Sequence, residues 1–334
     1  MINALITLFG GIAIFLYGLK NISSGTESLI TNTKTNALSA LEGRPIMGAL
    51  LGMAVAGVTQ SSVAISFITV SLVEVGALSF AASAPIIIGA NVGTTVTAQL
   101  VSLSGGGGSA IGAISSIIGL LTAFCKKDWV KRIGEVAFGL GFVFAGLSIM
   151  DTSIRSLAGY GWFKSLFLLS NPIALFLNGL VLTAVVQSSS AVTGITVLLA
   201  SSGLVDFKTA VFLTLGSNVG SCFSVIVASL NKSLQARRAS LFNLLFNLLG
   251  AVIFFPILLI FGNVAESLFL AFSTSLGRAI ANFHTVFNLV CALLFMPFCG
   301  KLTSLIAKVV TDKRPVMKNR EDNKTFTSKS RRFY

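Results

Sequence analysis

Val185-Val186-Gln187-Ser188-Ser189-Ser190-Ala191 places four consecutive polar side chains inside an apolar run that has no charged residue between positions 165 and 205. Polar groups are costly in hydrocarbon unless they are paired or serve a function. A near copy, Val58-Thr59-Gln60-Ser61-Ser62-Val63-Ala64, occurs earlier in the chain. We therefore interpret the two stretches as the halves of one binding site in the middle of a membrane.

The composition is that of an integral membrane protein. Of the 334 residues, 54% are hydrophobic and 10% are charged, and the mean hydropathy is +0.89. A soluble domain carries about 25% charged residues, and about 20 apolar residues suffice to cross a bilayer. We expect an all-α, multi-pass protein of the cell (inner or plasma) membrane. Residues 2–19 are interpreted as a retained span, because no basic residue precedes them and no small-residue cleavage site follows.

The basic charge is concentrated at one end of the chain. The net charge is +13, and residues 301–334 contain ten Lys or Arg against three Asp or Glu. Such a segment is typical of a cytoplasmic tail beside anionic lipid, and we favour this over nucleic-acid binding. The four cysteines show no CxxC spacing, which indicates isolated thiols, with neither a disulfide framework nor a metal site.

An internal repeat organises the chain. An offset of 127 residues aligns the two Gln-Ser-Ser motifs, Gly76 with Gly203, and Gly89-Ala90-Asn91-Val92-Gly93-Thr94 with Gly216-Ser217-Asn218-Val219-Gly220-Ser221, all without a gap. Similar apolar composition does not explain matched Gln and Asn residues. We interpret the chain as two related halves.

The charges of the loops predict that the two halves have opposite orientations. The loop at 104–109 is uncharged, whereas its counterpart at 231–238 carries three Lys or Arg. Short basic loops stay in the cytoplasm, so the two loops belong on opposite sides. Three crossings per half produce this inversion if each Gln-Ser segment is a re-entrant hairpin. The resulting topology puts 20 of the 24 Lys and Arg on the cytoplasmic side, together with the C-terminus.

The predicted fold class is therefore an all-α polytopic membrane protein with two inverted-topology repeats, each with a re-entrant helical hairpin, plus a C-terminal span. Its predicted parts are a first repeat at 1–132 with a hairpin at 46–73, a second repeat at 133–262 with a hairpin at 172–202, a final transmembrane helix at 263–304, and a basic cytoplasmic tail at 305–334.

Helix ends and neutral polar groups at the middle of a membrane suit a small ion. Helix N-termini there offer unpaired N–H groups to an anion. Neither Gln-Ser segment contains a charged side chain, so a multiply charged anion would lack a fixed countercharge. A co-bound cation would supply it, and Na⁺ fits a cage of hydroxyl, amide and carbonyl oxygens. Proton coupling requires a titratable group, which these segments lack.

The paired motifs resemble those of the sodium-dependent phosphate cotransporter family, in which each Gln-Ser-Ser motif is followed by Gly-x-Asn-Val-Gly. The resemblance implies Na⁺-coupled transport of inorganic phosphate by alternating access, with no organic cofactor. It implies substrate and ion binding at Gln60, Ser61, Ser62, Gln187, Ser188, Ser189 and Ser190, with Asn91, Thr94, Thr95, Asn218 and Ser221 as a second group. Na⁺ is placed at Gln60, Ser61, Ser62, Gln187, Ser188 and Ser189. Val63 departs from the pattern, since it replaces the third Ser of the first motif.

Other interpretations remain open on the sequence. A phosphate channel, a passive efflux pathway or a Na⁺-coupled carrier of another small anion would suit the same fold. An intramembrane serine enzyme is disfavoured, because serine activation needs a base and the sole histidine, His284, lies far along the chain from both motifs. We interpret His284 as a packing residue. The expected partners are inorganic phosphate, Na⁺ and the lipid bilayer, with a homodimer as a further candidate and no nucleic acid.

Overall fold

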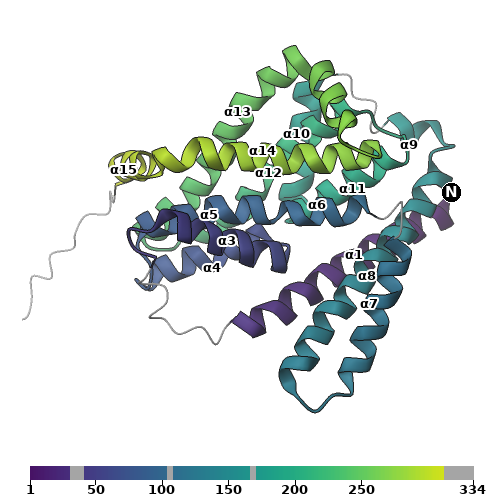
Figure 1. Ribbon diagram of the computed structural model, residues 1–334. Helices are drawn as coiled ribbons and strands as arrows, with labels where there is room; N and C mark the ends of the chain where they lie inside the picture. Colours follow the sequence, from purple (N-terminus) through teal and green to yellow (C-terminus); the bar gives the residue numbers. More distant parts are fainter. Residues whose placement is uncertain (31–40, 104–107, 166–170, 312–334) are drawn as a thin grey trace, which may run out of the picture.

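The computed structural model describes residues 1–30, 41–103, 108–165 and 171–311, and within them the chain is helical (Figure 1). The helices are α1 (Ile2–Ile30), α3 (Pro45–Thr59), α4 (Ser62–Glu74), α5 (Phe80–Gly93), α6 (Thr95–Ser102), α7 (Gly108–Ala123), α8 (Asp128–Leu157), α9 (Gly161–Ser165), α10 (Pro172–Val186), α11 (Ser189–Ser201), α12 (Phe207–Ser229), α13 (Leu234–Ala271), α14 (Leu276–Phe295), the 3₁₀ turn η1 (Met296–Phe298) and α15 (Cys299–Val309). The predicted basic tail at 305–334 lies mostly outside the described residues.

Six stretches of the described chain are long and apolar enough to cross a membrane: Ile2–Gly25, Phe80–Ser102, Asp128–Leu157, Phe207–Ser229, Leu234–Ala271 and Leu276–Val309. This confirms the prediction of an all-α polytopic membrane protein. One expected span differs in length. Helix α1 continues to Ile30, well past the expected end at Leu19. Helix α7 has only 16 residues, a rise of about 24 Å, which is shorter than a typical membrane crossing.

Helices α3 and α4 form a hairpin whose two ends lie at the same place. The carboxylate of Glu42, before α3, accepts hydrogen bonds from the backbone N–H (3.1 Å) and the hydroxyl (2.9 Å) of Ser79, after α4. The carboxylate of Glu74, at the end of α4, accepts a bond from the N–H of Ser233 over 2.7 Å. Hydrogen bonding to the side chain of Ser233, and then to its backbone N–H, lowers the pKa of Glu74. The segment after α4 therefore lies beside the segment before α3, and the end of α4 lies next to the beginning of α13.

Unusual backbone conformations recur at the same offset of 127 residues. Gln60 and Gln187 have φ of 54° and 58°, and they are the only residues other than glycine with positive φ in the described chain. Gly76 and Gly203 both have φ of 71°. The repeat in the sequence is thus also a repeat of local structure.

The first helix of each hairpin packs closely on the long helix that follows: α3 on α5, and α10 on α12. The contact is made through glycines of the repeated motif. A Cβ atom added at Gly89 would collide with the carbonyl oxygen of Ala49, and one added at Gly216 would collide with that of Phe176. These two pairs are equivalent in the repeat, so the motif glycines are required by close packing.

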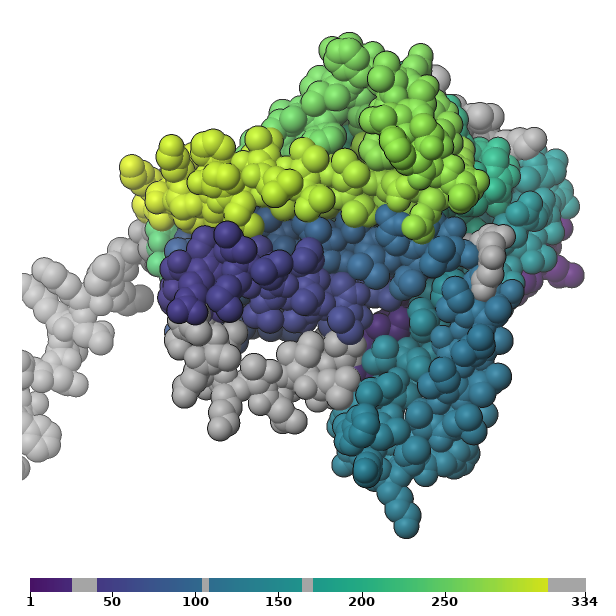
Figure 2. Space-filling view, in the orientation of Figure 1, coloured from purple at the N-terminus to yellow at the C-terminus, as the bar shows by residue number. Residues whose placement is uncertain are grey.

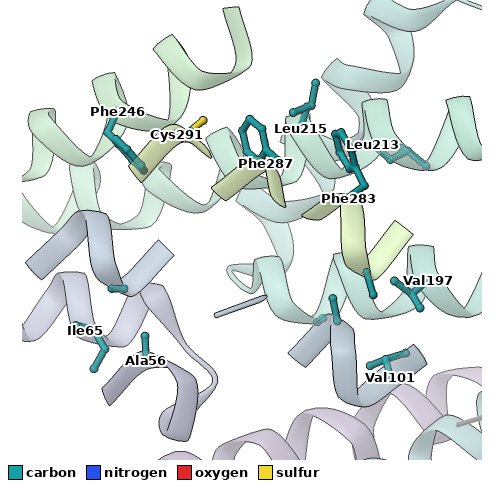
Figure 3. Packing of buried hydrophobic residues seen from close by; sticks show 14 of the residues in the cluster. Ala56, Ile65, Val101, Val197, Leu213, Leu215, Phe246, Phe283, Phe287 and Cys291 are labelled. Atoms are coloured by element: carbon teal, nitrogen blue, oxygen red, sulfur yellow. The ribbon is translucent and has the colours of Figure 1, made fainter. Parts of the chain in front are cut away.

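Phenylalanine rings fill the core around α12, α13 and α14. Phe283 and Phe287 stack at a centroid distance of 6.2 Å, and Phe254 meets Phe287 edge-on at 4.9 Å. Figure 3 shows Phe283 and Phe287 on the side of α14 that faces Leu213 and Leu215 of α12. Aromatic packing of this kind holds α12, α13 and α14 in fixed positions relative to one another.

Candidate functional site

The tip of each hairpin is a two-residue turn between helices. Gln60 ends α3 and Gln187 ends α10, each in the left-handed conformation that side chains other than glycine rarely adopt. A glycine would adopt this conformation at lower cost. A residue other than glycine in this backbone conformation costs free energy. The presence of Gln at both positions therefore favours a functional role for its side chain.

The next residue at each tip caps the second helix of the hairpin. The hydroxyl oxygen of Ser61 accepts a bond from the N–H of Ala64 (3.1 Å), and that of Ser188 accepts one from the N–H of Ala191 (3.2 Å). A hydroxyl that accepts in this way can still donate its own hydrogen. Each tip therefore presents a hydroxyl donor beside the N-terminus of a helix, which is a favourable surrounding for an anion.

The two tips meet at one cavity of about 390 Å³, which a third element, α1, completes. In the space-filling view of Figure 2, the purple surface of α1 lies between the blue surface of the first hairpin and the teal helices α7 and α8. The cavity is lined by Leu16, Leu19, Lys20, Ser23, Ser24, Thr59, Gln60, Ser61, Gln187 and Ser188. Four predicted site residues, two from each repeat, thus line the same space.

Ser190 joins the two hairpins. Its hydroxyl donates to the backbone carbonyl of Gln60 over 2.8 Å and lies 3.1 Å from the hydroxyl of Thr94. The equivalent position in the first motif is Val63, which has no hydroxyl to donate. The contact between the repeats is therefore one-sided.

The two glutamines differ in exposure although their backbones match. Gln60 is 6% exposed, and among the described residues its Oε1 atom is buried without a hydrogen-bond partner. Gln187 is exposed. An orphaned buried oxygen is costly, and a bound cation would remove that cost.

Ser62 and Ser189 are buried in the first turns of α4 and α11 and do not line the cavity. The residues of the second predicted group also lie outside it. Asn91 donates to the carbonyl of Ile87 (2.9 Å) on its own helix. The hydroxyls of Thr95 and Ser221 donate to the carbonyls three residues earlier, at 2.8 and 2.7 Å.

Asn218 has a partner from another helix. Its Oδ1 atom lies 3.2 Å from Nε2 of His284, in a buried contact between α12 and α14. Asn288 donates to the backbone carbonyl of His284 at 2.9 Å. His284 thus contacts the repeated Asn motif and does not line the cavity of the hairpin tips.

The sequence reasoning did not identify the contribution of α1. Leu16, Leu19, Lys20, Ser23 and Ser24 have the spacing of one helix face, and together they form one wall of the cavity. The expected end of the span at Leu19 left Lys20 outside the membrane-spanning helix. Continuing the 3.6-residue period past Leu19 would have placed Lys20 on the face of Leu16.

A cavity between two repeat-related hairpins in a polytopic helical protein is the arrangement of a membrane transporter. The family model described as Na⁺/Pi-cotransporter matches this chain twice, over residues 14–152 and 146–296. The chain therefore belongs to the Na⁺/Pi-cotransporter family, as the sequence motifs predicted.

Several curated proteins are similar to the chain. It is 29% identical over 312 residues to "Uncharacterized protein YqeW" of Bacillus subtilis, covering 92% of this chain and 99% of that protein. It is 24% identical to "Putative inorganic phosphate export protein YjbB" of Escherichia coli K12, again over 92% of this chain but only 56% of that protein. A segment covering 30% of the chain is 34% identical to 16% of "Sodium-dependent phosphate transport protein 2A" of Rattus norvegicus. No solved structure matches.

Proposed function

We propose that the protein is a secondary active transporter that moves inorganic phosphate together with Na⁺ by alternating access, and that it is not an enzyme. The observation that carries this proposal is the convergence of the two Gln-Ser tips, one from each repeat, on one cavity. Membership of the Na⁺/Pi-cotransporter family supports phosphate as the substrate. The similarity to a protein named for sodium-dependent phosphate transport supports Na⁺ as the coupled ion.

In the proposed mechanism, phosphate binds at the donors of the tips. The hydroxyl hydrogens of Ser61 and Ser188 point to phosphate oxygens, beside the N-termini of α4 and α11. Na⁺ binds among the oxygens of Gln60, Ser61, Gln187 and Ser188, which line the cavity, and the orphaned Oε1 of Gln60 is one ligand. The predicted ligands Ser62 and Ser189 are buried behind the tips and are left out of this set. The cation offsets the charge of the anion, so the two enter the cavity together.

Alternating access requires the tips to be reached from each side of the membrane in turn. We propose that the two repeats are inverted, that the hairpins at 46–73 and 172–202 are re-entrant and enter from opposite sides, and that the C-terminus is cytoplasmic. The bond between Ser190 and Gln60 then holds the two tips together in one state of the cycle.

Uptake of radiolabelled phosphate into proteoliposomes tests the proposal. An inward Na⁺ gradient should drive accumulation, and an equal K⁺ gradient should not. A patch recording that shows large phosphate currents without Na⁺ would instead establish a channel. Competition by sulfate equal to that by phosphate would indicate a carrier of another anion.

Export is the second candidate direction, because the relatives named YjbB are described as putative phosphate export proteins. Phosphate loss from cells that overproduce the protein, measured at high and low external Na⁺, separates the two directions. Loss that increases at low external Na⁺ supports coupled export.

A further inference from the structure

We propose that the ammonium group of Lys20 is the fixed countercharge that binds phosphate at the hairpin tips. The inference rests on the proposed function. It assigns the positive charge that balances phosphate to a residue of α1, which lies outside both Gln-Ser motifs. Three observations carry it: the position of Lys20 in the cavity, the lack of a carboxylate partner for it among the described residues, and the division of donors and acceptors around it.

Lys20 belongs to the wall of the cavity. It lies one helical turn after Leu16 and one before Ser24, on the face of α1 that looks toward Gln60, Ser61, Gln187 and Ser188. Helix α1 continues for ten more residues, so Lys20 is not at its end. A lysine at a helix end can extend to the membrane surface, whereas this lysine shares a cavity with the hairpin tips.

No carboxylate partner for Lys20 is found among the described residues. The ion pair that they contain joins Arg155 and Asp151 at 2.9 Å. Within the described lining of the cavity, Lys20 is also the only charged residue. Lys20 is exposed in this cavity, and charged residues within membrane-spanning helices mark ion and substrate pathways.

The groups around Lys20 separate into donors and acceptors. The Lys20 ammonium has three hydrogens to donate, and Ser61 and Ser188 have hydroxyl hydrogens beside helix N-termini. Gln60 contributes the orphaned oxygen Oε1. An oxyanion fits the donors and a cation fits the oxygen, so phosphate and Na⁺ have adjacent places in one cavity, with the hydroxyls of Ser61 and Ser188 within reach of both. Lys20 supplies one positive charge that would otherwise have to come from a second cation.

Three variants in proteoliposomes test the role of this charge. Lys20→Met keeps much of the side-chain length but removes the ammonium, and Lys20→Arg keeps a cation. Lys127→Met removes an exposed lysine at the start of α8 that does not line the cavity, and is the matched control. A charge-assisted hydrogen bond contributes roughly a ten- to hundredfold change in affinity.

We expect Lys20→Met to raise the phosphate concentration for half-maximal uptake by about tenfold or more. Lys20→Arg should remain within about threefold of wild type, because it keeps the charge, and Lys127→Met should be unchanged. Na⁺-driven uptake with a wild-type phosphate requirement in Lys20→Met overturns the role of Lys20 alone. Absence of uptake by the wild-type protein under either ion gradient overturns the proposed function itself.

Chemical restoration of the charge separates binding from folding. Lys20→Cys in a Cys125→Ser background offers one accessible thiol, since Cys222, Cys291 and Cys299 are buried. A methanethiosulfonate reagent carrying an ethylammonium group restores a cation of lysine-like length, whereas the methyl reagent adds a neutral group. Uptake at low phosphate should recover with the first reagent only. Equal recovery with both overturns the proposal, as does failure of the substituted thiol to react with either.

Discussion

The hydroxyl of Ser190 donates to the backbone carbonyl of Gln60 over 2.8 Å and so links the second hairpin to the tip of the first. The bond spans 130 positions of sequence and is buried. It connects the two repeats at the point where their polar motifs meet. The geometry of the cavity therefore depends on a contact that one repeat supplies and the other receives.

Ser190→Ala should destabilise the protein and weaken transport together. Removing the hydroxyl leaves the buried Gln60 carbonyl without this donor, at a cost of about 1–3 kcal/mol. The measurement is the melting temperature in detergent, together with phosphate uptake. Ser83→Ala is the control, because the buried Ser83 hydroxyl bonds only to Phe80 of its own helix in the described structure. Equal behaviour of the two variants would contradict the role of the link.

Val63→Thr should increase the apparent affinity for Na⁺. Threonine has the shape of valine but adds a hydroxyl oxygen at the tip of the first hairpin, where the second motif has Ser190. One additional hydrogen-bonding oxygen contributes about 1 kcal/mol, or roughly a fivefold change in the half-saturating Na⁺ concentration. Val63→Ala, which has no hydroxyl, is the control. A Na⁺ response that is the same in both variants would argue against an ion at this tip.

Gln60→Gly and Gln187→Gly should separate folding from function. Both positions have positive φ, so glycine removes a backbone cost of about 1–2 kcal/mol while deleting the amide. We expect the melting temperature to hold or rise and Na⁺-dependent uptake to fall at least about tenfold, as for loss of one strong polar contact. Gln→Ala at the same positions keeps the backbone cost and should lower both quantities. Normal uptake by both glycine variants would contradict the assignment of the two side-chain amides to the binding site.

Gly216→Ala should destabilise the fold strongly. The added methyl group would collide with the carbonyl oxygen of Phe176, and overpacking of this kind costs about 1–3 kcal/mol. Gly10→Ala in α1 is the matched control, since a Cβ there meets nothing within 4 Å. Thermal unfolding of the two variants checks the difference. An unchanged melting temperature for Gly216→Ala would refute close packing as the reason for the motif glycine.

The bond between Glu74 and Ser233 should make part of the stability depend on pH. The side chain of Ser233, and then its backbone N–H, stabilise the ionised carboxylate and lower its pKa below the ordinary value of 4.5. The contribution is therefore present near neutrality and disappears as the pH falls through the lowered pKa. Glu74→Gln should melt below wild type at pH about 7 and match it at pH about 3. A difference between the two proteins that persists at the acidic pH would exclude this cause.

Periodicity and polar motifs predicted much of this molecule. The offset of 127 residues, found in the sequence, recurs in the φ angles of Gln60 and Gln187 and of Gly76 and Gly203. The helical membrane class followed from composition, because a long apolar stretch has few alternatives to a helix in lipid. Motif residues that line the cavity, such as Ser61 and Ser188, could be named because they repeat.

The contribution of α1 could not be found by the same method. Lys20 has no counterpart in a Gln-Ser motif, and its role depends on how α1 packs against both hairpins, which is a long-range property. Asn91 and Asn218 repeat in the sequence but not in their contacts. One bonds to its own helix and the other to His284 of α14. The 127-residue offset has Leu157 in place of this histidine, so the first repeat has no equivalent imidazole at that offset.

The one-sided bond of Ser190 means that the two repeats are no longer interchangeable. A chain assembled from two copies of the first repeat would carry Val63 at both tips and could not form the link. A chain assembled from two copies of the second would carry the donor twice. Every residue has a backbone carbonyl, so the acceptor is present in either repeat, and the link requires only that one of the two halves carries a hydroxyl at the position of Ser190.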